Sequence, residues 1–324
     1  MYTFNEILEK IEHEVKNLEF VYPPKSLYEP VEYILSLGGK RIRPALVLMA
    51  YNIYKDDVEQ AIRTAIGLEV FHNFTLLHDD LMDQADKRRN KPTVHKVWNA
   101  NTAILSGDAM LIAAYKLMAE TPGTYLKEVL DLFTQTAAEI CGGQQYDMEF
   151  ETRDDVKEEE YIEMIRLKTA VLLACSLKVG AILAGAPKED AENLYQFGIN
   201  IGLSFQLQDD LLDVYGDTET FGKNIGGDIL CDKKTFLLIN AFRLADEKQL
   251  TELNKWIGAK SCKPEEKIAA VTAIYNEIGL KKLSEDKMQE YYNLAMNNLS
   301  ALKVESSKLD VLKDVVSRLM FRKS

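Results

Sequence analysis

Cysteine is scarce in this sequence, and no cysteine pair has the spacing of a zinc site. Its 324 residues include only Cys141, Cys175, Cys231 and Cys262, which lie far apart and have no neighbouring histidines. A zinc finger and a disulfide-stabilised secreted scaffold are therefore not indicated. The N-terminus also lacks the basic and apolar stretches of a secretion signal. These absences predict free thiols and a cytoplasmic location.

Positive charge is in deficit. Lysine and arginine number 39 against 51 aspartates and glutamates, which gives a formal charge of −12 and a pI near 5.0. A nucleic-acid-binding protein normally carries the opposite balance. Nucleic acid is therefore not an expected partner, and an anionic substrate would have to be held by local basic clusters or by bound cations.

No uninterrupted apolar run reaches the length of a membrane span. The longest candidate, Thr169–Ala186, contains Lys178 and is followed by Pro187. A spanning helix usually needs about 20 apolar residues. With 47% hydrophobic residues the chain has ample material for a packed core, so this segment is expected to be a buried helix and no transmembrane segment is predicted.

Alternating strand patterns are also missing, whereas apolar residues recur at helical spacing along most of the chain. No Gly/Ser-rich linker divides it. The sequence therefore predicts an all-α fold with one domain over residues 1–324. Long helices are expected near residues 3–20, 58–84, 97–119, 124–150, 158–185, 189–214 and 281–318.

Two acidic segments resemble each other. "LLHDDLMD" at Leu76–Asp83 reappears as "LQDDLLD" at Leu207–Asp213, each near the C-terminal end of an apolar helical segment. Carboxylates one helical turn apart repel one another, and the helix dipole adds to the repulsion at this end. A single such cluster could be a solvated helix end, but the second copy favours a binding function. Oxygen-only ligands favour Mg²⁺ that shares its shell with phosphates.

Basic residues accompany these clusters. Arg88 and Arg89 follow the first, Lys223 follows the second within "FGKNIGGDI", and "GGKRIRP" at 38–44 supplies Lys40, Arg41 and Arg43. Arginine suits two-pronged phosphate capture, and lysine acts as a point charge. Three basic loops near two carboxylate clusters point to one or two diphosphates.

Histidines leave an alternative open. His72, His78 and Asp79 superficially match the histidine-aspartate pattern of helical metal phosphohydrolases, although that chemistry needs more imidazole ligands than His13 and His95 supply. His72 could also be an ordinary histidine of an apolar helix face. Its place two turns before Asp79 favours a site position.

The chain resembles the trans-isoprenyl diphosphate synthases, also called the polyprenyl synthetase family, and is most similar to short-chain geranylgeranyl and farnesyl diphosphate synthases. The matching segments, in the family's order, are "GGKRIRP" at 38–44, "DDLMDQADKRRNKPTVH" at 79–95, "GQQYD" at 143–147, "KTA" at 168–170, "FQLQDDLLDVYGD" at 205–217 and "GKNIGGDI" at 222–229. The resemblance implies a helical bundle around a central cavity, a homodimer, and three Mg²⁺ ions when substrate is bound.

The resemblance also implies roles for individual residues. Mg²⁺ is expected on Asp79, Asp83 and Asp209, with Asp80, Asp210 and Asp213 in support. The allylic diphosphate is expected on Arg88, Lys168 and Lys223, with Thr169 and Gln206 at the reacting end of the prenyl chain. Isopentenyl diphosphate is expected on Lys40, Arg43, His72 and Arg89. Asn90 stands where the family usually has glycine; asparagine tolerates unusual turn conformations, so little consequence is expected.

The implied reaction is head-to-tail condensation through an allylic carbocation, with the departing pyrophosphate as base. Phe74 is a bulky aromatic five residues before Asp79, and Thr75 beside it is small. By the family pattern, Phe74 would stop elongation early. The small Thr75 and the lack of a two-residue insertion within the first cluster resemble geranylgeranyl synthases more than farnesyl synthases, so a product of twenty carbons is favoured over one of fifteen. An ordinary core phenylalanine is the alternative.

Three other functions are considered. A longer-chain polyprenyl diphosphate synthase would share all of these motifs. A terpene cyclase would share the first cluster, but its second metal motif normally mixes Asn, Ser or Thr with Glu, unlike Asp209–Asp213. A non-catalytic prenyltransferase subunit would be expected to have lost one of the two clusters, and both are intact.

Overall fold

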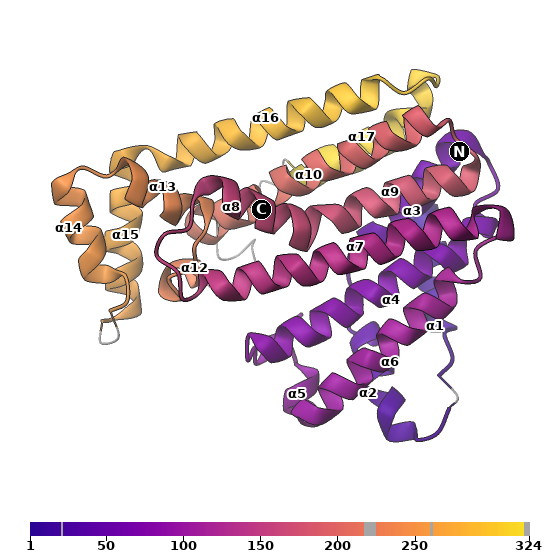
Figure 1. Ribbon diagram of the computed structural model, residues 1–324, viewed down its shortest axis with the longest axis horizontal. Helices are drawn as coiled ribbons and strands as arrows, with labels where there is room; N and C mark the ends of the chain where they lie inside the picture. The colour runs from indigo at the N-terminus through magenta and orange to yellow at the C-terminus, as the bar shows by residue number, and fades with distance from the viewer. Residues whose placement is uncertain (21, 217–224, 260–261, 321–324) are drawn as a thin grey trace. The chain divides into compact units, whose positions relative to one another are not determined.

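The computed structural model describes residues 1–20, 22–216, 225–259 and 262–320, and its regular structure is almost entirely helical (Figure 1). The predicted all-α fold is confirmed. The helices are α1 (Phe4–Lys16), α2 (Lys25–Ser36), α3 (Ile42–Tyr54), α4 (Glu59–Met82), α5 (Val94–Val97), α6 (Ala100–Met118), α7 (Gly123–Phe150), α8 (Glu158–Ile165), the π-helical η1 (Arg166–Ala170), α9 (Val171–Ala184), α10 (Lys188–Tyr215), α12 (Gly227–Leu230), α13 (Phe236–Leu244), α14 (Glu247–Trp256), α15 (Pro264–Ile278), α16 (Leu280–Ser300), the 3₁₀ turn η2 (Ser306–Leu309) and α17 (Asp310–Met320).

The chain folds into two compact units, each built from separate stretches of sequence. Unit 1 comprises Met1–Thr134, Cys175–Leu194 and Lys303–Leu312. Unit 2 comprises Gln135–Ala174, Tyr195–Leu302 and Lys313–Ser324, of which the structure describes the ranges given above. The chain crosses between units inside α7, α10 and α17, near the start of α9, and between α16 and η2. The single domain over residues 1–324 stays a prediction.

The core of unit 1 is organised around α4. This helix packs against α6 and α3, and its first half is buried on nearly all sides, from Ala61 to Phe71. A helix surrounded by apolar neighbours is held rigidly over its length. Its last turn, which carries the first aspartate cluster, is therefore fixed in place by core packing rather than by local propensity.

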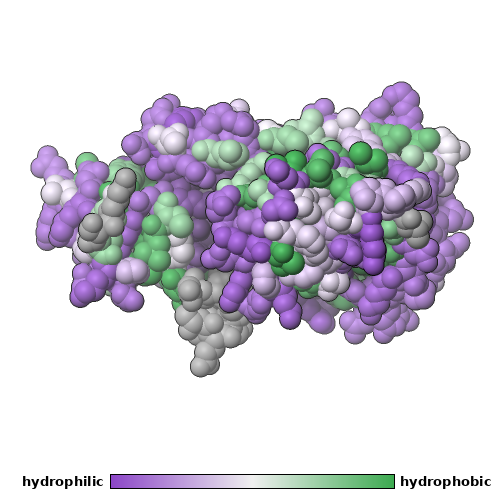
Figure 2. Space-filling model, turned by 90° about the horizontal axis from the view of Figure 1, so that it is seen from below, coloured by the Kyte–Doolittle hydropathy of each residue, from purple (hydrophilic) through white to green (hydrophobic). Residues whose placement is uncertain are grey.

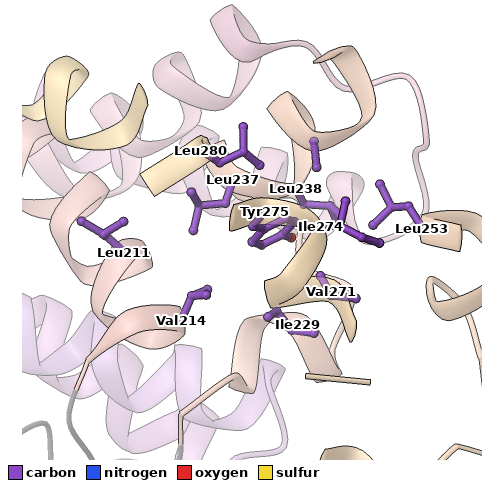
Figure 3. Close-up of a cluster of buried hydrophobic side chains, with 11 residues drawn as sticks. Leu211, Val214, Ile229, Leu237, Leu238, Leu253, Val271, Ile274, Tyr275 and Leu280 are labelled. Carbon is purple, nitrogen blue, oxygen red and sulfur yellow. The ribbon is translucent and has the colours of Figure 1, made fainter. Parts of the chain in front are cut away.

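The core of unit 2 fixes the second cluster in a similar way. Leu211 and Val214 of α10 pack against buried side chains of α12, α13 and α15, among them Ile229, Leu237 and Tyr275 (Figure 3). Leu211 and Val214 directly follow two of the aspartates in sequence. Burial of apolar side chains contributes about 1.5–3 kcal/mol each, so this end of α10 is firmly anchored.

Some predicted helix boundaries are wrong. The first helix ends at Lys16, with Asn17 as its C-cap, rather than near residue 20. The helix predicted over 281–318 is interrupted, because α16 ends at Ser300 and η2 precedes α17. No proline or glycine lies between residues 301 and 309 to signal this break.

A short strand pair was not predicted. Lys87–Arg88 (β1) and Lys91–Pro92 (β2) form an antiparallel pair. Arg89 and Asn90 form its turn, with φ of 51° and 62°. Asparagine tolerates this left-handed region better than most residues, and Asn90 does adopt it; that the replacement of glycine has little consequence stays a prediction.

Within the described ranges, one helical stretch, Glu158–Ala184, is long and apolar enough to cross a membrane, but 78% of its most apolar window is buried inside the protein. Such burial is typical of a core helix, as the sequence predicted. On the face shown in Figure 2, hydrophilic side chains cover most of the surface and hydrophobic ones lie between them.

Candidate functional site

The first aspartate cluster lies on the last turn of α4. Asp79 and Asp80 belong to the helix and Asp83 is its C-cap. Asp80 is 3% exposed and accepts three contacts from Arg88, from Nε at 2.9 Å to each carboxylate oxygen and from Nη2 at 2.7 Å to Oδ1. Asp79 is only partly buried and Asp83 is exposed. The middle aspartate is therefore anchored, whereas the outer two remain accessible.

The β1–β2 turn positions Arg88 and Arg89. Thr93 fixes its base, because its backbone N–H donates to Asp86 O at 3.1 Å and its hydroxyl donates to Ala85 O at 2.7 Å. Arg88 is thereby directed at Asp80. The guanidinium of Arg89 lies against Gly39, where a Cβ atom would be 2.7 Å from Arg89 Nη2. Only glycine leaves room for this contact.

A second group of cations surrounds His72. Arg43 Nη1 lies 3.0 Å from His72 Nε2, and because arginine has no acceptor, this nitrogen of His72 must be the unprotonated one. Burial, followed by the positive charges of Arg43, Arg89, Arg88 and Arg41, holds the pKa of His72 well below its usual 6.5. His72 is therefore neutral at physiological pH.

The positive charge of Arg43 is destabilised by its surroundings. Burial lowers its pKa to about 10; the charge of Glu69 opposes this shift, and the charge of Arg89 contributes to it. Its Nε is buried and has no hydrogen-bond partner in the part of the chain that the structure describes. Such an orphaned donor on a cation fits a site where an anion binds.

Arg41, in contrast, is structural. It is 3% exposed, pairs with Glu69 at 2.7 Å and Glu12 at 2.9 Å, and donates to Leu35 O at 2.9 Å. Its backbone lies in the left-handed region with φ of 47° and starts α3. The sequence placed Arg41 in a basic loop but carried no sign of Glu69, an acidic residue buried in mid-helix.

The residues predicted to set chain length lie on α4 before the first cluster. Phe74 is partly buried, and its ring packs against Phe71 at 5.5 Å and edge-on against His78 at 4.8 Å between centroids. Thr75 donates its hydroxyl to His72 O at 2.8 Å. His78 Nε2 lies 3.2 Å from Ile104 O, so His78 contacts α6 rather than joining His72 in a metal site.

The second aspartate cluster follows the same pattern as the first. Asp210 is 6% exposed, accepts a hydrogen bond from the Tyr161 hydroxyl on Oδ2, and lies 3.2 Å from Gln206 Nε2 through Oδ1. Burial, with the nearby Asp228 carboxylate, raises the pKa of Asp210 to about 7, although both hydrogen bonds act to lower it. Asp209 is only partly buried.

Asp213 contacts the segment at the start of α12 through hydrogen bonds to its backbone. Its Oδ2 accepts from Asp228 N at 2.9 Å, and its carbonyl accepts from Gly226 N at 2.6 Å. Lys223, predicted to bind diphosphate, lies outside the described residues. Asp228 belongs to the "GKNIGGDI" motif, but no role was predicted for it.

Lys168 and Thr169 lie in η1, a π-helical segment between α8 and α9. The backbones of α7 and α10 touch this segment, because a Cβ at Gly143 would be 2.4 Å from Lys168 N and one at Gly202 would be 2.5 Å from Ala170 Cα. Single-turn π segments inside α-helices are frequent at functional sites.

The side chains of η1 are oriented by polar partners. Lys168 Nζ donates to Asp147 at 2.6 Å, and Thr169 Oγ1 donates to Gln206 Oε1 at 3.3 Å. Burial would raise the pKa of Asp147, but Lys233 and Lys168 together lower it. Asp147 and Lys233 were missed as site residues, although Asp147 ends the "GQQYD" motif.

The donor chemistry of both clusters fits Mg²⁺. The accessible groups are carboxylates, which hard cations prefer. Among the residues that the structure describes, no three His, Cys, Asp or Glu side chains converge into a preformed ion site. Mg²⁺ does not need such a cage, because it usually takes one or two carboxylates and completes its shell with water and phosphate oxygens.

Comparisons with known proteins agree with this geometry. Residues 24–276 match the family model "Polyprenyl synthetase". A short chain isoprenyl diphosphate synthase of Methanocaldococcus jannaschii is 41% identical over 80% of this chain and 79% of its own, and a geranylgeranyl diphosphate synthase of Sulfolobus acidocaldarius is 37% identical over 95% and 93%. A crystal structure of a geranylgeranyl pyrophosphate synthase superimposes with a TM-score of 0.95, 44% identity and full coverage of both chains. The chain therefore belongs to the polyprenyl synthetase family, and it is a trans-prenyltransferase.

Proposed function

We propose that this enzyme condenses isopentenyl diphosphate with allylic prenyl diphosphates, with a twenty-carbon geranylgeranyl product favoured and a fifteen-carbon farnesyl product next. The observation that carries the proposal is that the two clusters have the same arrangement. In each, the middle aspartate, Asp80 or Asp210, is buried and held by a hydrogen-bond donor, and the aspartates before and after it lie near the end of the helix. The names of the relatives reported above support the short-chain assignment.

Members of this family generally depend on magnesium. In the proposed arrangement Asp79, Asp83 and Asp209 hold Mg²⁺, three ions in all when substrate is bound, while Asp80, Asp210 and Asp213 position them. Bound Mg²⁺ supplies electrostatic stabilisation for the diphosphate that leaves the allylic substrate. Lys168, already oriented by Asp147, contributes positive charge beside the same group, together with Arg88 and Lys223.

Arg88 has a double task in this proposal. Its two-pronged contact with Asp80 occupies Nε and Nη2, and Nη1 has no partner among the described residues. A guanidinium anchored on one edge presents its other edge in a fixed direction. Arg88 can therefore bind a phosphate oxygen without releasing Asp80.

Isopentenyl diphosphate is proposed to bind the cation group of unit 1. Lys40, Arg43, His72 and Arg89 would hold its diphosphate, and the neutral state of His72 makes it a hydrogen-bond donor through Nδ1 rather than a further positive charge. The partial burial of Arg43 strengthens its attraction for an anion, because less water is present to screen the interaction.

The reacting end of the prenyl chain is proposed to lie near Thr169 and Gln206. Their mutual hydrogen bond at 3.3 Å fixes both side chains, and neither is an activated nucleophile. Their oxygens can stabilise an adjacent allylic cation by their dipoles. No protein group needs to form a covalent bond to substrate. After the isopentenyl double bond has attacked the allylic cation, the departing pyrophosphate takes the proton that the resulting cation loses as the new double bond forms.

The proposal includes a homodimer and a cytoplasmic location. The outward side of α6 exposes Ile104, Leu105 and Ile112, which are 45%, 59% and 70% accessible. Large apolar side chains grouped on one exposed helix face favour association with another protein surface. A second copy of this chain is the proposed partner, and sedimentation or light scattering at several concentrations tests it.

Product analysis tests the function. The purified chain is incubated with Mg²⁺, labelled isopentenyl diphosphate and, in separate reactions, dimethylallyl, geranyl or farnesyl diphosphate, and the prenyl products are sized. Products that end at fifteen or twenty carbons support the proposal. Products of thirty carbons or more would identify a longer-chain synthase, whereas pyrophosphate release from farnesyl diphosphate alone would identify a cyclase.

A further inference from the structure

The middle aspartates of the two clusters are anchored by chemically different donors. Asp80 is held by the cationic guanidinium of Arg88. Asp210 is held by two neutral groups, the Tyr161 hydroxyl and the Gln206 amide, one on each carboxylate oxygen. The second cluster therefore gains no positive charge from its anchors, whereas the first gains one.

We propose that Tyr161 is a positioning residue that acts through Asp210 to hold the second aspartate cluster in its metal-binding geometry. This inference rests on the proposed function. Tyr161 lies on α8, is 2% exposed, and its hydroxyl reaches across to α10. A ring packed in the core has few rotamers, so it sets the position of Asp210 rather than following it.

The same hydroxyl begins a chain of hydrogen bonds that reaches the π-helical segment. Asp210 Oδ1 accepts from Gln206 Nε2 at 3.2 Å, and Gln206 Oε1 accepts from Thr169 at 3.3 Å. Because an amide donates through one end and accepts through the other, Asp210 determines which way Gln206 is turned. Loss of the Tyr161 hydroxyl would therefore disturb both Asp209 and the orientation of Gln206 toward Thr169.

Tyr161→Phe tests the proposal, since it removes the hydroxyl and keeps the ring. Tyr51→Phe is a matched control: Tyr51 is also a buried tyrosine, 1% exposed, and its hydroxyl has no partner among the described residues. Thermal melts of the full chain are recorded with inorganic pyrophosphate at increasing Mg²⁺. Loss of a residue that orients a metal ligand typically weakens metal binding 10–100-fold, so Tyr161→Phe should need about tenfold more Mg²⁺ for half the stabilisation. Tyr51→Phe should match the wild type.

Steady-state rates give a second readout. Tyr161→Phe should lower kcat and raise the Mg²⁺ needed for half the maximal rate, while KM for isopentenyl diphosphate stays unchanged, because its proposed ligands belong to unit 1. An unchanged Mg²⁺ midpoint in Tyr161→Phe overturns the inference. This holds even if the variant melts at a lower temperature without ligand, because such a result would show that Tyr161 has a purely structural role. If Mg²⁺ and pyrophosphate fail to stabilise the wild type, the proposed metal site fails instead.

A double variant supplies an independent test. Because Tyr161 acts through Asp210, the loss of Mg²⁺-dependent stabilisation in Asp210→Asn should not deepen when Tyr161→Phe is added. Losses that simply add would show that the two residues act separately and would overturn the inference.

Discussion

Adding one methyl group at Gly143 should disable the enzyme, whereas the same change at the preceding residue should not. Both glycines lie inside α7, in its C-terminal third. A Cβ at Gly143 would be 2.4 Å from Lys168 N and 2.8 Å from Lys168 Cα, but a Cβ at Gly142 would meet nothing within 4 Å. The pair therefore isolates the contact between α7 and the π-helical segment.

The size of the effect follows from these distances. Ordinary contact begins at 3.4 Å, so Gly143→Ala must push the backbone of Lys168 away by about 1 Å. A misplacement of about 1 Å near the reacting groups can lower the rate about 100-fold. Overpacking of this kind also costs about 1–3 kcal/mol of stability. Gly142→Ala should instead raise stability by about 0.5–1 kcal/mol, because alanine favours the helix.

The assay compares kcat, KM and chemical denaturation for the wild type and both variants. We expect kcat to fall about 100-fold in Gly143→Ala and to remain within twofold in Gly142→Ala. The reasoning would be refuted by a Gly143→Ala enzyme with normal kcat, or by equal losses in both variants, since either result would mean that the close approach at Gly143 does not position Lys168.

Three further variants test the site. Phe74→Ala should lengthen the product by at least one five-carbon unit, measured by sizing the products, whereas Phe71→Leu in the fully buried core should leave the product unchanged; an unaltered product from Phe74→Ala would remove Phe74 from the cavity floor. Arg88→Lys should lower kcat about tenfold and raise the Mg²⁺ requirement, because a lysine offers one point charge in place of a two-pronged contact. The control in the Mg²⁺ titration is Arg63→Lys, which changes an arginine that forms a surface ion pair elsewhere. Because the pKa of His72 is depressed in the folded state, below about pH 6.5 the unfolded chain takes up a proton that the folded chain does not, so stability falls as pH decreases. The melting temperature measured from pH 7.5 to about 5.5 should therefore decline less steeply in His72→Asn than in the wild type. Equal slopes would contradict the assigned direction of the pKa shift.

The sequence predicted the helical fold and both aspartate clusters because their signals are local. Periodic apolar residues and repeated carboxylates can be recognised without knowing what lies beside them. Asn90 is a similar case, since its tolerance of positive φ follows from its own side chain. These features need no information about tertiary contacts.

The missed features depend on neighbours distant in sequence. Glu69 and Tyr161 resemble ordinary helix residues until Arg41 and Asp210 are placed beside them. Gly143 begins the "GQQYD" motif, but only its 2.4 Å approach to Lys168 N explains why glycine is required. The break between α16 and α17 likewise contains no proline or glycine from which it could have been predicted.

The crowding of arginines around His72 would link the stability of unit 1 to the binding of its proposed ligand. Arg43 and Arg89 lie close enough for the charge of Arg89 to lower the pKa of Arg43, and the buried Glu69 that opposes this is already engaged by Arg41. An anion that binds between them relieves the repulsion in the folded state alone, so the protein should gain stability with ligand concentration. Cells degrade proteins in proportion to the fraction that unfolds. If isopentenyl diphosphate binds this group as proposed, the abundance of the enzyme should therefore follow the availability of that substrate without any separate regulator.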